Sequence, residues 1–213
     1  MPKSGKTEEA SEFPLTDEQL LEGECSVVLC VQTAPSIKWG KWSKNMKIIA
    51  EDNLVVEKTA DGYGLATGTV VVGGGDGVRE GYFEVELTAD SADNNMGGML
   101  VGIVKTGLDH ETSHFNTNNA WCLCADNGGL YGNDKFQDDK QGKLKVGDRV
   151  GVLVDLDGGE GDDGGSVRFF VNGSEYGSGF KSGVVGPVVL GVELFFKSQK
   201  LTILPEVEKP AGA

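Results

Sequence analysis

The chain has 213 residues, of which 38% are hydrophobic and 24% charged, a profile that is typical of one soluble domain with a full core and excludes a disordered protein. Its formal net charge of −14 argues against long-range attraction to nucleic acid or to anionic membrane surfaces. The same charge would attract a basic partner surface, and it would equally well serve only to keep the protein in solution.

The amino-terminal residues are expected to contain no strand. Residues 1–12 are polar and charged and predict a disordered tail. This tail has no apolar segment of the kind found in secretory signals, and no run approaches the roughly 20 apolar residues that cross a bilayer, so we expect a cytoplasmic protein. Residues 13–24 predict a short helix, because Thr16 can cap its start and Gly23 can end it.

Residues 25–205 predict a single domain built from strands. The 33 glycines lack the period of collagen and separate short apolar runs, which indicates many turns and therefore many strands. Phe83, Val85 and Leu87 alternate with polar residues, and residues 167–171 alternate in the same way. About a dozen such runs predict an all-β fold, a two-layer antiparallel sandwich, followed by a C-terminal tail at 206–213.

The cysteines do not suggest a disulfide or zinc framework. Cys25, Cys30, Cys122 and Cys124 include no C-x-x-C pair. We therefore predict reduced thiols, with those on strands buried as small apolar side chains.

Several short segments occur in a characteristic order. They are GYFEV (81–85), VGI (101–103), AWCL (120–123), GDRVGVLVDLD (147–157), VRFFVNG (167–173), GSGF (177–180) and GPVV (186–189). Over about residues 60–204 this order resembles the SPRY domain family. The resemblance implies a concanavalin-like jelly-roll sandwich that binds protein partners through its loops and is not an enzyme. The acidic, glycine-rich stretch 157–165 departs from the family pattern, where a shorter turn joins the strands.

Two other motifs suggest metal chemistry. His110-Glu111-Thr112-Ser113-His114 fits the H-E-x-x-H pattern of zinc proteases, but that chemistry needs a helix, and the flanking residues are typical of a loop. We therefore favour a partner-binding loop over a zinc site. The stretch 157–165 is rich in oxygen ligands but lacks the register of an EF-hand, so a solvated loop is the leading interpretation and calcium stays open. No metal or cofactor is predicted.

The predicted function is non-catalytic binding of a peptide or protein surface, as a subunit or adaptor of a larger assembly. The loops around 39–42, 110–119, 126–131 and 195–197 are expected to form one binding edge. Its predicted members are Trp39, Trp42, His110, His114, Phe115, Asn118, Asn127, Tyr131 and Phe196. A lectin-like carbohydrate site, with or without calcium, is the alternative, and a zinc enzyme at 110–114 is a remote one.

Overall fold

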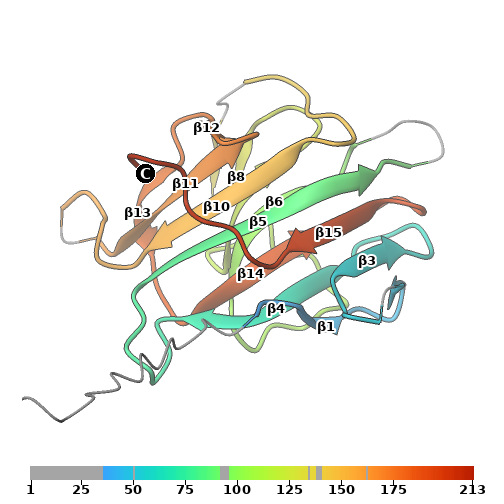
Figure 1. Ribbon diagram of the computed structural model, residues 1–213, viewed down its shortest axis with the longest axis horizontal. Helices are drawn as coiled ribbons and strands as arrows, with labels where there is room; N and C mark the ends of the chain where they lie inside the picture. The colour runs from blue at the N-terminus through green and yellow to red at the C-terminus, as the bar shows by residue number, and fades with distance from the viewer. Residues whose placement is uncertain (1–35, 50, 92–95, 134, 138–140, 162) are drawn as a thin grey trace, which may run out of the picture. The chain divides into compact units, whose positions relative to one another are not determined.

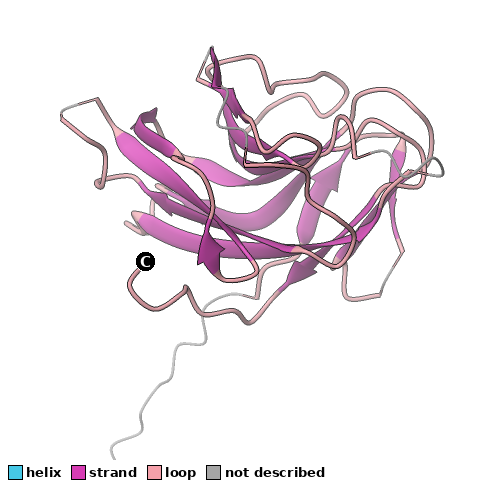
Figure 2. Ribbon diagram, turned by 90° about the horizontal axis from the view of Figure 1, so that it is seen from above, coloured by secondary structure: helices cyan, strands magenta, loops and turns pink. Residues whose placement is uncertain are grey.

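A computed structural model of the chain describes residues 36–49, 51–91, 96–133, 135–137, 141–161 and 163–213. The predicted tail at 1–12, the predicted helix at 13–24 and the first residues of the predicted sandwich, 25–35, lie outside this range. Every regular element of the described part is a β-strand (Figure 2). None of the described residues belongs to a helix long and apolar enough to cross a membrane.

The described strands form two antiparallel sheets, as predicted (Figure 1). The seven-stranded sheet contains, in spatial order, β1 (Trp39–Trp42), β4 (Leu65–Val72), β14 (Val188–Glu193), β6 (Leu100–Lys105), β7 (Ala120–Cys124), β8 (Leu130–Gly132) and β9 (Lys135–Gln137). The eight-stranded sheet contains β12 (Ser174–Glu175), β11 (Gly165–Val171), β10 (Arg149–Asp155), β5 (Glu80–Ala89), β15 (Lys200–Leu204), β3 (Val55–Lys58) and β2 (Met46–Ile48), with β13 (Phe180–Val184) paired to β11.

The core lies between the inner faces of these sheets. Phe83, Val85 and Leu87 of β5 are at most 3% exposed, which confirms the alternation predicted for this strand. Trp121 and Phe169, at 1% and 0% exposed, are equally buried. Since alternate residues face alternate sides, the polar residues of β5 lie on the outer face of the eight-stranded sheet.

The glycine motifs occupy positions where other residues would not fit. In the turn between β11 and β12, Asn172 and Gly173 have φ angles of 52° and 80°, the left-handed geometry that tight hairpins require. In β6, a Cβ atom on Gly102 would lie 2.0 Å from the carbonyl oxygen of Trp121. The neighbouring strand β7 therefore approaches too closely for any side chain at this position.

A long loop covers the outer face of the seven-stranded sheet. Residues 106–119, which connect β6 to β7 and which we call the strap, place Leu108 and Phe115 against this face. Beneath it lies a second apolar cluster, formed by Leu65, Leu100, Val104, Ala120, Cys122, Cys124 and Val189. Cys122 and Cys124 are buried free thiols, as predicted, whereas Cys25 and Cys30 lie outside the described residues.

The end of the chain lies on the other sheet. After β15, residues 205–213 form no strand and cross the outer face of the eight-stranded sheet (Figure 1). Lys209 Nζ is 2.8 Å from Glu80 Oε1 of β5. On the same face Leu153 and Phe170 are each only 3% exposed.

Candidate partner-binding surface

Strand register brings several turns together at one end of the sandwich. Glu193, the last residue of β14, is opposite Leu65, the first residue of β4, and opposite Leu100, the first residue of β6. Leu100 is in turn opposite Cys124, the last residue of β7. The turns that precede β4 and follow β7 and β14 therefore share this end, and the strap reaches it from the outer face.

Five aromatic side chains from these turns, from the strap and from β8 form a continuous row, which we call the aromatic row: Phe196, Phe195, Tyr63, Phe115 and Tyr131. Successive ring centroids are 4.9, 4.9, 5.9 and 5.5 Å apart. Three of the four contacts are edge-to-face, the geometry that aromatic rings favour. The row thus joins residues that are far apart in sequence into one surface feature.

The aromatic row is accessible to a partner. Tyr63 at its centre is 45% exposed, although its ring contacts two other rings. Phe115, Tyr131, Phe195 and Phe196 are each half-buried. Half-buried rings expose apolar area while their packing fixes their orientation, so a partner would not have to order them on binding.

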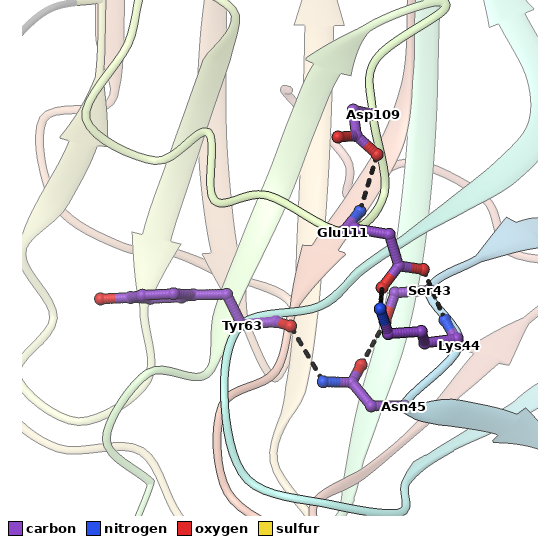
Figure 3. Close-up of polar contacts among 6 residues, drawn as sticks. All are labelled: Ser43, Lys44, Asn45, Tyr63, Asp109 and Glu111. Atoms are coloured by element: carbon purple, nitrogen blue, oxygen red, sulfur yellow. Dashed lines mark hydrogen bonds and ion pairs between the residues drawn. The ribbon is translucent and has the colours of Figure 1, made fainter.

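The tip of the strap is tied to the turn between β1 and β2 (Figure 3). Glu111 Oε1 accepts a hydrogen bond of 2.7 Å from the backbone of Lys44, and its Oε2 lies 3.5 Å from Lys44 Nζ. Asp109 Oδ1 accepts from the Glu111 amide at 3.0 Å. In the same turn, Asn45 bonds both the Ser43 hydroxyl and the carbonyl oxygen of Tyr63, which connects this network to the aromatic row.

A buried carboxylate holds the middle of the strap. Glu193 is 2% exposed, and its two oxygens accept hydrogen bonds from Ser113 Oγ at 2.6 Å and from the His114 amide at 2.5 Å. Burial raises the pKa of Glu193 above its ordinary value, although these hydrogen bonds act in the opposite direction. Glu193 therefore fixes Phe115, the next residue after His114, in its place in the aromatic row.

A buried lysine lies beneath the same turns. Lys58, at the end of β3, is 0% exposed, and among the described residues its Nζ has no hydrogen-bond partner. Burial lowers the pKa of Lys58 to about 8, while attraction to Glu111, Asp61 and Glu193 partly opposes this shift. The strap and the turn before β4 thus share one buried cation.

A groove adjoins the strap on the side of β1. It has a volume of about 450 Å³, and Trp42, Leu108, His110 and Glu111 are among its lining residues. A second hollow of about 290 Å³ continues it along β4 and shares Leu108 and His110. Trp42 is 39% exposed, whereas the half-buried His110 bonds Thr67 Oγ1 through Nε2 at 3.0 Å, and burial lowers its pKa.

The structure brings most of the predicted site residues to this surface. Phe115, Tyr131 and Phe196 belong to the aromatic row, and Trp42 and His110 line the groove. Asn127 supports the row, because its Nδ2 donates to the Tyr131 hydroxyl at 3.3 Å. Asn118 is exposed on the returning part of the strap.

The prediction that Trp39 is an exposed anchor is wrong. Trp39 is 1% exposed, lies in the core and donates from Nε1 to the carbonyl oxygen of Leu54 at 2.8 Å. Trp39 and Trp42 are the two ends of β1, and a β-bulge between Trp39 and Lys41 interrupts the alternation of side chains between them. Only Trp42 reaches solvent.

His114 is also unavailable to a partner. It is 9% exposed, and its Nε2 lies 2.7 Å from the carbonyl oxygen of Asp109, within the strap itself. Its contribution to a binding site is therefore indirect, through the shape of the strap.

The H-E-x-x-H segment lacks the geometry of a zinc site. Residues 110–114 form a loop, and the ring nitrogens of His110 and His114 bond to Thr67 and to Asp109 respectively. In the described part of the chain no three His, Cys, Asp or Glu side chains could together hold a metal ion. In the acidic stretch, Asp157 pairs with Arg79 at 2.9 Å and Glu160 with Lys181 at 3.3 Å.

Two members of the aromatic row were not among the predicted site residues. Tyr63 lies in a turn between Gly62 and Gly64, where no periodic pattern indicates which way a side chain points. Phe195 is adjacent to Phe196, and of the two only Phe196 is a predicted member of the binding edge. An aromatic residue between two glycines in a predicted turn is the signal that would have indicated Tyr63.

Comparisons with known proteins agree with the fold. A family model described as SPRY domain matches residues 80–202. The solved SPRY domain of human HERC1 has a TM-score of 0.60 and 18% identity, over 79% of this chain and 99% of that chain. A structure described as a human SPRY domain has a TM-score of 0.54 and 18% identity, over 76% and 98%. The TRIM65 PSpry domain has a TM-score of 0.58 and 13% identity, over 80% and 90%. No curated protein sequence matches the chain.

Proposed function

Because this chain belongs to the SPRY domain family, we propose that it binds a protein partner through the aromatic row, as an adaptor or subunit of a larger assembly. SPRY domains are non-catalytic modules for protein–protein interaction. The proposal assigns that general role to one surface of this chain. It also includes a cytoplasmic location, which the two buried free thiols favour.

The proposal rests on one observation. The aromatic side chains of the row pack against one another and are partly exposed to solvent, and hydrogen bonds hold the strap that contributes to the row. Aromatic residues contribute much of the binding energy at protein interfaces, especially where they are already held in place. Here the strap is held by Glu193, and its tip by Lys44. The partner is expected to place apolar side chains over Tyr63 and its neighbours and to extend toward the groove beside Trp42.

The charge of the chain adds an expectation about the rest of the partner. With a formal net charge of −14, the protein would be approached faster by a basic partner than by an acidic one. Association should therefore slow as the ionic strength rises, whereas the apolar contacts with the aromatic row should depend little on salt.

The proposal is tested with variants of the aromatic row. The partner is captured from native extract, identified by mass spectrometry, purified, and titrated against the intact chain by calorimetry. Tyr63→Ala and Phe196→Ala should each weaken binding about tenfold or more, as expected for interface anchors. Val185→Ala is the matched control, because Val185 is an exposed apolar residue, 57% exposed, that belongs to neither the row nor the groove. Equal affinity for all three variants would remove the aromatic row from the interface.

A further inference from the structure

A separate cleft of about 340 Å³ lies on the eight-stranded sheet, the layer opposite the one that the strap covers. Leu153 of β10 lines it, and residues 158 and 160 of the loop between β10 and β11 form part of its wall. This loop is the acidic stretch 157–165 in which the sequence departs from the SPRY pattern. The cleft is therefore built partly from a feature particular to this chain.

The lining of the cleft carries an excess of negative charge. Four carboxylates, Glu80, Asp155, Glu160 and Glu175, stand against two cations, Arg168 and Lys181, which leaves a difference of two negative charges. Each cation already has a carboxylate nearby: Lys181 is 3.3 Å from Glu160, and Arg168 is 4.0 Å from Glu175. Glu80 and Asp155 are therefore the two lining carboxylates that have no cation of the lining beside them.

The chain's own C-terminal segment places a lysine side chain beside one of these carboxylates. Lys209 places its Nζ 2.8 Å from Glu80 Oε1, although it belongs to a segment without strand structure. The two side chains are 44% and 47% exposed, and an ion pair this exposed adds little stability. Another lysine or arginine could therefore replace Lys209 at small cost.

We propose that the cleft is a second docking site, which takes a lysine or arginine side chain from an extended basic segment of a partner protein, in competition with Lys209. The inference rests on the proposed function, since it assumes that the chain binds proteins, but it concerns a different surface. The carboxylates would hold the charged group while the aliphatic part of the side chain lies over Leu153. The acidic loop would guide the basic segment toward the cleft.

The test uses the full chain and a fluorescein-labelled probe, the peptide of residues 205–213 carrying Glu206→Lys and Glu208→Lys. Binding is followed by fluorescence anisotropy at low salt. Lys209→Ala should tighten binding about two- to fivefold, because it frees Glu80. Adding Glu80→Gln and Asp155→Asn should then weaken binding about tenfold. Both substitutions keep a hydrogen-bond acceptor, so the fold is expected to survive, and circular dichroism checks this.

The control pair is Glu86→Gln with Asp90→Asn, which makes the same change in net charge but lies outside the lining of the cleft. In the Lys209→Ala background this pair should change binding less than about twofold. Equal weakening by both pairs would reduce the effect to overall charge, and failure of the probe to bind the Lys209→Ala chain would overturn the proposal directly. Neither result involves the aromatic row, so the proposed function is judged separately by the Tyr63 and Phe196 variants.

Discussion

Replacing the buried lysine beneath the aromatic row by methionine should stabilise the protein at neutral pH. Lys58 is fully buried, and its Nζ has no hydrogen-bond partner among the described residues. A methionine has a similar length, fills the same space and carries no charge to be desolvated. Lys58→Met therefore removes a cost that attraction to Glu111, Asp61 and Glu193 only partly offsets.

The size and the pH dependence of this effect follow from the pKa of Lys58, which burial lowers from 10.5 to about 8. A difference of about 2.5 in pKa corresponds to about 3 kcal/mol between the charged and neutral forms. Between pH 8 and 10.5 the unfolded chain holds this proton more tightly than the folded one, so stability rises with pH in that window. The gain from Lys58→Met should accordingly be about 3 kcal/mol at pH 7 and about 1 kcal/mol at pH 10.

The assay is urea unfolding of the parent and the variant at several pH values between 7 and 10. Taking the difference between the two proteins cancels the titration of all other groups that they share. Lys47→Met is the control, since the side chain of Lys47 is 52% exposed, and it should change stability by less than about 0.5 kcal/mol at either pH. A destabilised Lys58→Met variant, or a gain that stays constant with pH, would refute the reasoning.

Three further outcomes are expected. Glu193→Ala should cost about 2–4 kcal/mol and speed hydrogen exchange at the His114 amide, because Ser113 and His114 lose their acceptor; unchanged exchange would contradict the role given to Glu193. Gly102→Ala should cost more than about 3 kcal/mol in urea unfolding, whereas Gly75→Ala, where a Cβ would meet nothing within 4 Å, should be nearly neutral. Burial raises the pKa of the Cys122 and Cys124 thiols, so peptide mapping should find neither of them labelled by maleimide at pH 7 unless the protein is first unfolded.

The sandwich could be predicted from the sequence because its signals are local. The alternation at Phe83, Val85 and Leu87 reports directly on burial, and Asn172-Gly173 specifies a hairpin without reference to the rest of the chain. The burial of Trp39 could not be predicted in this way, because a β-bulge between Trp39 and Lys41 interrupts the alternation of β1.

The candidate site was harder to predict because it depends on contacts between distant segments. Tyr63 meets Phe115 and Phe195, which are 52 and 132 residues away along the chain. No window of sequence shows that three turns and a strap share one end of a sandwich; the strand register does. The carbohydrate-binding alternative remains a prediction, as do the partner and the assembly.

The strap has a consequence for how this protein can change over time. Its inner side chains, Leu108 and Phe115, seal apolar residues that would otherwise make the outside of the seven-stranded sheet adhesive. Its outward-facing residues, such as the exposed Asn118, do not cover this apolar cluster. New specificities can therefore arise by exchanging outward residues of the strap, while the inward ones keep the molecule from aggregating.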